Sequence, residues 1–240
     1  MMIVVLHAAQ TPAVQGGKLE LSGTTSNQIN TKQPFQLNRI LALGILLNVM
    51  SHQDSFAANF GDDVAFIRKH TDVILLTDKS KSAQVAVAPA WQGRVMTSTA
   101  GGANGASFGW INRELIASGK LQPHINVFGG EDRFWLGPEG GQFSIFFAPG
   151  AKFELSDWFT PAPLDTMPYR VVKQSAESVS FAAEFTLTNY SGTRFDVRVN
   201  RAVKLLSAAE AWKHLGVRAV AGVNLVAFET DNRITNVGKV

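Results

Sequence analysis

Acidic, basic and aromatic side chains gather in residues 128–147, FGGEDRFWLGPEGGQFSIFF, which hold two pairs of glycines. Glu131 and Asp132 bring carboxylates, Arg133 a guanidinium and Trp135 a broad apolar ring. Carboxylates suit general acid–base chemistry, and a guanidinium donates paired hydrogen bonds to hydroxyl or carboxylate groups. Aromatic rings pack against the C–H-rich faces of sugars. This combination indicates a polar segment, bounded by glycines, that delivers charges to the end of a β-sheet.

His124 is the histidine nearest to this segment and a candidate for general acid–base chemistry. Each candidate also has a structural interpretation. His124 follows Pro123 and would then be a surface loop residue, residues 131–133 would form an internal salt-bridged turn, and Trp135 would pack in the core. The residue pattern identifies no catalytic acid–base pair.

Several other kinds of site are excluded by composition. The chain has 240 residues and no cysteine, so it forms no disulfide and no thiolate metal site. Its 5 histidines lack metal-ligand spacing, and no nucleotide-binding glycine loop is present, so we expect neither metal nor cofactor. Because 22 basic residues face 19 acidic ones without a basic run, nucleic acid is not an expected partner.

The elements that would position these side chains are mostly strands. Residues 178–188 and 194–205 alternate in polarity around an Asn-Tyr-Ser-Gly-Thr turn, which predicts a long antiparallel hairpin with one buried face. Residues 73–77 and 85–91 predict a second hairpin. Phe143, Ile145 and Phe147 alternate as a strand would, and so do residues 217–228.

Helices are expected to be few and short. Asn112 as N-cap and Gly119 as stop predict a helix over residues 113–118. Ser207 and Glu210 form a capping box for another short helix, while residues 62–70 fit a helix or a strand. Because there is no β-α-β rhythm, the expected fold is all-β, a large antiparallel β-sandwich.

Arg201 breaks the apolar row of its strand, between Val199 and Val203. One interpretation is a bulge or a snorkelling side chain at the edge of the sheet. The other is a cation that points into a polar pocket. Arg201 is therefore a second candidate for binding a ligand.

The first 57 residues are expected to be a leader and residues 58–240 the folded domain. Arg39, an apolar run over residues 40–50 and the small residues Ser55 and Ala57 match a signal peptide cleaved after Ala57. The run is too short to span a bilayer. We expect a protein exported to the periplasm or the exterior, with residues 1–36 preceding the natural start of translation.

The order of these motifs resembles the galactose mutarotase-like proteins, the superfamily of aldose 1-epimerases. The resemblance rests on the Gly-Gly…Arg133-Phe-Trp135-Leu-Gly-Pro-Glu139 segment, on Trp158…Pro161…Leu-Asp165…Pro-Tyr169, and on Arg201…Leu205 before Phe-Glu229-Thr. It covers residues 62–240. The resemblance implies an antiparallel supersandwich with a sugar-binding cleft on one sheet.

The resemblance also implies a function at the anomeric carbon of a sugar. The expected activity is epimerase or mutarotase, with a carbohydrate as partner and the chain as a monomer. The alternative is a carbohydrate-binding or structural module without catalysis. Because the family's catalytic glutamate lies late in the chain, the resemblance implies either further sequence beyond Val240 or a reduced form of the fold.

Overall fold

The computed structural model of the chain describes the backbone of residues 2–10 and both backbone and side chains over residues 59–239. The signal-like segment, residues 37–57, lies outside the described residues. In the described part, no helix is long and apolar enough to cross a membrane.

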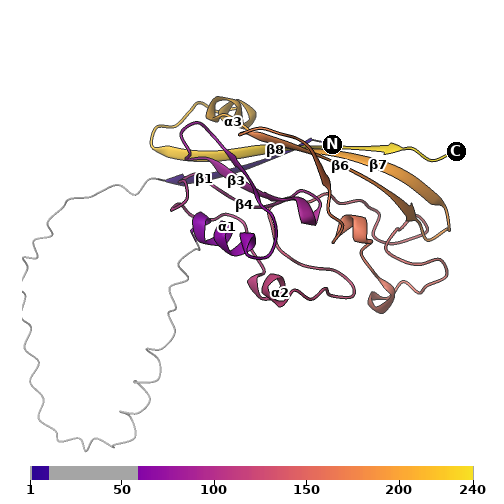
Figure 1. The fold of residues 1–240 in the computed structure, drawn as a ribbon. Helices are drawn as coiled ribbons and strands as arrows, with labels where there is room; N and C mark the ends of the chain where they lie inside the picture. The colour runs from indigo at the N-terminus through magenta and orange to yellow at the C-terminus, as the bar shows by residue number, and fades with distance from the viewer. Residues whose placement is uncertain (1, 11–58, 240) are drawn as a thin grey trace, which may run out of the picture. The chain divides into compact units, whose positions relative to one another are not determined.

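Two antiparallel sheets form the described domain (Figure 1). The larger sheet has the strand order β1-β8-β7-β6-β5 and the smaller one β2-β3-β4. The strands are Met2–Gln10 (β1), Ile74–Thr77 (β2), Gln84–Ala88 (β3), Arg94–Thr99 (β4), Arg170–Gln174 (β5), Ser178–Thr188 (β6), Arg194–Leu205 (β7) and Val223–Asn236 (β8). The expected all-β antiparallel fold is confirmed.

The long hairpin of β6 and β7 is confirmed as predicted. Its register runs without a break from Ser178↔Lys204 to Thr188↔Arg194. Val179, Phe181 and the other apolar members of the odd row are buried or half-buried, and the even row is more exposed. The alternation of the sequence therefore sets which face of the sheet turns inward.

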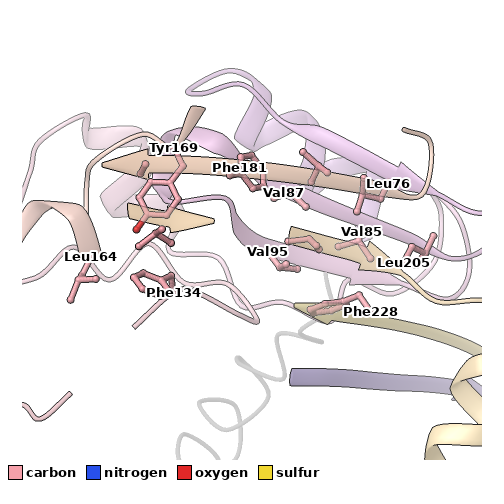
Figure 2. Close-up of a cluster of buried hydrophobic side chains, with 14 of the residues drawn as sticks. Leu76, Val85, Val87, Val95, Phe134, Leu164, Tyr169, Phe181, Leu205 and Phe228 are labelled. Atoms are coloured by element: carbon pink, nitrogen blue, oxygen red, sulfur yellow. The ribbon is translucent and has the colours of Figure 1, made fainter. Parts of the chain in front are cut away.

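The main core lies between the two sheets. Val85, Val87 and Val95 from the smaller sheet share one buried cluster with Phe181 and Phe228 from the larger sheet. Figure 2 shows these side chains, together with Leu164 and Tyr169 from the connection that precedes β5. The irregular segment over residues 151–169 thus contributes to the core without being a strand.

Short helices cover the outer faces. The helices are Phe60–Arg68 (α1), Arg113–Ser118 (α2) and Ala208–Leu215 (α3), and the 3₁₀ turns are Pro89–Trp91, Leu155–Asp157 and Ala162–Leu164. Both predicted helices have the predicted caps, Asn112 with Gly119 and the Ser207–Glu210 capping box. The side chain of Asn59 accepts a hydrogen bond from the backbone N–H of Asp62 and so caps the start of α1. The segment over residues 62–70, for which a helix or a strand was expected, is therefore mostly helical.

The strand expected at Phe143, Ile145 and Phe147 is wrong. The backbone there forms turns, and Ser144 N donates to Gly141 O at 3.0 Å. Phe143 is 61% exposed whereas Phe147 is 8% exposed. The glycines at 140 and 141 break the segment, so a short apolar alternation does not make a ladder.

Other boundaries also differ from the predictions. Trp91 belongs to a 3₁₀ turn and not to the strand of the hairpin. β8 begins at Val223 and extends to Asn236, later than the expected residues 217–228. Neither β5 nor β1 was predicted; β5 is exposed along its whole length, and β1 lies in the stretch expected to be leader.

Candidate functional site

The glycine-rich segment is attached to the edge of the smaller sheet. Glu131 N donates to Val95 O at 2.8 Å, and Val95 N donates to Asp132 O at 3.0 Å, so this part of the segment forms an isolated antiparallel bridge with β4. Gly130 N donates to Trp110 O at 2.8 Å on the other side. The segment therefore has a defined position, from which its side chains reach toward the rest of the domain.

Gly129 and Gly130 are required for this close approach. Both have positive φ values, +89° and +108°. A Cβ on Gly129 would lie 2.2 Å from Trp110 O, and one on Gly130 would lie 2.7 Å from Val95 O. Any other residue would push the segment away from Trp110 at position 129, or away from β4 at position 130, and displace the charged side chains that follow.

Asp132 and Arg201 form a buried ion pair between this segment and β7. Arg201 Nη2 donates to Asp132 Oδ1, and the two side chains are 0% and 6% exposed. Arg201 Nε donates to Gly93 O at 3.0 Å and Nη1 to Asn232 Oδ1 at 2.7 Å. Every nitrogen of this guanidinium has an acceptor, as a buried charge requires.

The interpretation of Arg201 as a bulge or a snorkelling side chain is wrong. Arg201 lies directly opposite Phe181 in an unbroken register. Its side chain is fully buried, so the charge points into the interior, where it is paired with Asp132. Its partners lie on three separate segments, and its role in this geometry is to hold them together.

Arg133 belongs to a second group of polar side chains. Its Nη2 donates to Leu164 O and lies 3.8 Å from Asp165 Oδ1. Its guanidinium carbon lies 4.2 Å from the centre of the Trp135 ring. The side chain remains 22% exposed, and Nη1 forms no hydrogen bond with any residue that the structure describes.

Asp165 is the buried carboxylate of this group. Its Oδ2 accepts from Asn126 N at 2.9 Å and from Asn126 Nδ2 at 2.7 Å. Oδ1 has no hydrogen-bond partner among the described residues, and the same holds for the nearby Arg133 Nε and Thr160 Oγ1. Buried polar atoms without partners are uncommon and mark a place where a ligand group or water is expected.

Arg94 lies close to the charges of Arg133 and Asp165 and is 1% exposed. Its Nη1 donates to Gly129 O at 3.1 Å and its Nη2 to Gln92 Oε1 at 3.3 Å. Burial, followed by the nearby charge of Arg133, lowers the pKa of Arg94 to about 9. The interior here is therefore positively charged and poorly solvated.

The remaining sequence candidates have local partners. Glu131 Oε2 accepts from Ser98 Oγ at 3.0 Å. Trp135 is half-buried against the main core, and its Nε1 donates to Glu139 Oε1 at 2.8 Å. His124 Nδ1 is 2.6 Å from Trp158 O, and the imidazole stacks on Phe159 with a centroid distance of 4.4 Å.

His124 lies near the second group through its backbone. Thr160 N donates to His124 O at 2.8 Å, and Asn126, two residues further along the chain, holds Asp165. If Nδ1 carries the proton that is shared with the Trp158 carbonyl, Nε2 is left as an acceptor. His124 is thus linked to the group that holds Arg133 through the backbone alone, and among the described residues no carboxylate is bonded to its imidazole.

Four of the six predicted residues therefore fall into two sets, whereas Glu131 and His124 have local partners of their own. Asp132 and Arg201 form an internal tie, whereas Arg133 and Trp135 belong to a group that we call the Arg133 cluster, completed by Arg94, Asn126 and Asp165. Sequence reasoning missed these three residues as site residues. Asp165 and Asn126 are 39 residues apart in the chain, and no local pattern reports such a contact.

Of the six predicted site residues, only Arg201 lines one of five surface hollows in the described part of the chain. That hollow measures about 250 Å³ and is shared with Ser180 and Asn200. Because the Arg201 side chain is fully buried, its guanidinium does not face this hollow. No group of acidic and histidine side chains in the described residues is arranged to hold a metal ion.

Comparison with known proteins gives one match. A model of a family of unknown function, DUF6786, matches residues 58–240. The chain belongs to this family. Neither the curated proteins nor the solved structures contain a match.

Proposed function

We propose that this member of the DUF6786 family is a carbohydrate-binding protein and that Arg133 is its principal ligand contact. One observation carries the proposal. The guanidinium is fixed by the Trp135 ring, the Leu164 carbonyl and Asp165, yet Nη1 has no partner in the described protein and the side chain is partly exposed. A guanidinium held in this way is preorganised to bind, because little conformational entropy remains to be lost.

Sugar chemistry fits the surroundings of Arg133. Hydroxyl groups both donate and accept hydrogen bonds, so one ligand can serve a guanidinium and the free nitrogen of His124. Phe159, stacked on His124 and 46% exposed, offers an apolar face beside them. The face of Trp135 is occupied by Arg133, so this ring supports the arginine and is not the surface on which a sugar would stack.

Binding has more support than catalysis. Ring opening and closing needs a base for the anomeric hydroxyl and an acid for the ring oxygen. Asp165 is 3% exposed, and one of its oxygens is held twice by Asn126. An epimerase or mutarotase activity would need a second acid–base group beside His124, and we propose it only as the second candidate, motivated by the resemblance to aldose 1-epimerases.

Direct binding tests the first candidate. Calorimetric titration of the full chain with mono- and oligosaccharides is expected to give saturable heats of binding, which the R133Q substitution abolishes. R198Q is the matched control, because Arg198 is an exposed arginine that pairs with Glu184 on the outer face of the sheet. Equal binding by R133Q and R198Q would move the site away from Arg133, and the absence of heat with every sugar would reject the proposal.

Polarimetry tests the second candidate. The optical rotation of a freshly dissolved galactose or glucose solution reaches its equilibrium value faster when a mutarotase is present. An H124Q variant is expected to remove any such acceleration. No acceleration by the full chain, under conditions in which binding is measured, would assign the protein to the non-catalytic class.

We also propose that the protein is exported, on the basis of the signal-like residues 37–57. Cleavage after Ala57 would remove β1, which pairs with β8 over Met2–Gln10. N-terminal sequencing of the natural protein distinguishes the two arrangements. A mature chain that retains residues 2–10 would reject export through this signal.

A further inference from the structure

The Arg133 cluster contains more buried cations than its carboxylates neutralise. Asp132 is engaged by Arg201, and Asp165 lies 3.8 Å from Arg133. Arg94 donates only to neutral acceptors, the Gly129 carbonyl and the Gln92 side chain, and forms no ion pair with any described residue. One of its nitrogens, Nε, is buried and has no hydrogen-bond partner among the residues that the structure describes.

Arg94 shares the charge of Asp165 with Arg133, so one carboxylate faces two guanidinium groups and leaves the buried charge of Arg94 only partly compensated. Fold stability alone does not explain this arrangement. An isolated ion loses its hydration on burial and regains it only through pairing. A guanidinium at this position does, however, raise the positive potential at the adjacent Arg133, whose Nη1 is available at the surface. The arrangement is therefore suited to attract an anion to Arg133.

We infer that the ligand of the Arg133 cluster is an anionic sugar, which carries a carboxylate or a phosphate group. The inference rests on the proposed function and specifies its substrate class. Nη1 of Arg133, which has no partner in the described protein, can donate a charge-assisted hydrogen bond to either anionic group, while the sugar hydroxyls contact His124. Arg94 acts as a positioning residue, because its charge favours the anion without touching it.

Three probes that differ in one substituent test this inference: galactose, galacturonate and galactose 6-phosphate. We expect at least one of the two anions to bind about 10-fold or more tightly than galactose, since hydrogen bonds to charged groups are stronger than neutral ones. The stronger of the two identifies carboxylate or phosphate as the recognised group. The preference should shrink between low and high salt, because exposed charges are screened.

Variants place the preference on the cluster. R133Q is expected to reduce the binding of the anion to that of galactose or below, and R198Q to leave it unchanged. R94Q is expected to weaken binding of the anionic sugar several-fold, with little effect on binding of galactose. If R94Q fails to fold, which thermal unfolding reports, the R133Q and salt measurements decide alone.

The possible failures are distinguishable. Galactose binding as tightly as both anions would overturn the inference and leave the carbohydrate proposal standing. An anion preference that survives in R133Q would overturn the assignment to this cluster. No binding of any of the three probes or of neutral oligosaccharides would overturn both proposals.

Discussion

Asp132 and Arg201 are 69 residues apart in the chain and form an ion pair whose side chains are almost completely excluded from solvent. Asp132 lies in the glycine-rich segment attached to β4 of the smaller sheet, and Arg201 lies in β7 of the larger sheet. The pair therefore joins the two halves of the sandwich at the same place as the apolar core. Its geometry has consequences for stability that can be measured.

Removing the charge of Asp132 is expected to destabilise the domain strongly. D132N leaves Arg201 buried without a counter-charge, which typically costs about 3–5 kcal/mol. The free energy of unfolding in urea measures this loss. E184Q is the control, because it removes an ion pair from the exposed face of the same hairpin, where the contribution is at most about 1 kcal/mol.

Similar losses for D132N and E184Q would contradict the role of the buried pair. In that case Arg201 would find other compensation in the variant, through Asn232 or solvent. The double variant D132L/R201M is informative as well. Replacement of both charges by apolar groups should recover part of the loss, since well-packed apolar residues often replace a buried pair without cost.

The two glycine pairs of the segment are expected to respond differently to substitution. Gly129 and Gly141 both have positive φ, +89° and +80°. A Cβ at Gly129 would lie 2.2 Å from Trp110 O, while nothing lies within 4 Å of one at Gly141. Both alanine variants bear the backbone strain, about 1–2 kcal/mol, but G129A adds a steric clash of about 1–3 kcal/mol.

Urea unfolding of G129A and G141A measures the difference directly. We expect G129A to be the less stable variant and to weaken sugar binding, because Arg133 follows four residues later. G141A should retain binding. Equal stability of the two variants would mean that the segment can move away from Trp110 without penalty, and the defined position of Arg133 would then be in doubt.

Features with a local signal were predictable from the sequence. The β6–β7 hairpin follows from side-chain alternation around a turn, and α3 follows from Ser207 and Glu210, three residues apart. In both, the interacting groups are near neighbours in the chain. Asp132 was a candidate for ligand contact, but its partner Arg201 could be found only in the folded structure.

The incorrect or missing predictions concern features that depend on contacts between residues far apart in the chain. Phe143, Ile145 and Phe147 alternate, yet no neighbouring strand is available to them and turns take their backbone hydrogen bonds. All residues of β5 are exposed, so its sequence has no alternation of buried and exposed side chains that would predict a strand. Arg94 and Asp165 have no unusual sequence neighbours, and their importance comes from burial next to Arg133.

The capping box of α3 is expected to make stability sensitive to acid. Hydrogen bonds from the Ser207 side chain and backbone, followed by Lys204, lower the pKa of Glu210 from its ordinary 4.5 to about 2. A carboxylate with a lowered pKa stabilises the fold above pH 4.5 and loses this contribution as the pH falls from 4.5 toward 2. Wild type should therefore lose its advantage over E210Q in this range.

Urea midpoints at pH 6 and pH 2.5 test this expectation. E114Q is the control, because Glu114 occupies the first turn of α2 and its side chain forms no hydrogen bond in the described part of the chain. The difference between wild type and E210Q should shrink at low pH by more than the difference between wild type and E114Q. A constant difference for E210Q would show that the capping box contributes no charge-dependent stability.

The cross-strand pair Val199 and Ile234 lies at the point where the buried face of the larger sheet becomes accessible. The two residues are directly opposite each other in β7 and β8, and both belong to the inward row. Val199 is 0% exposed and Ile234 is 49% exposed. Ile234 borders an apolar hollow of about 400 Å³ together with Phe143 and Phe195.

Truncation of these two neighbours should therefore have unequal effects. V199A removes fully buried methyl groups and is expected to cost about 2–3 kcal/mol, whereas I234A should cost about 1 kcal/mol or less because water already reaches its side chain. Unfolding in urea at two protein concentrations measures both. A loss for I234A as large as that for V199A would mean that the hollow is covered in solution, and a dependence of that loss on protein concentration would identify a second copy of the chain as the cover, against the expected monomer.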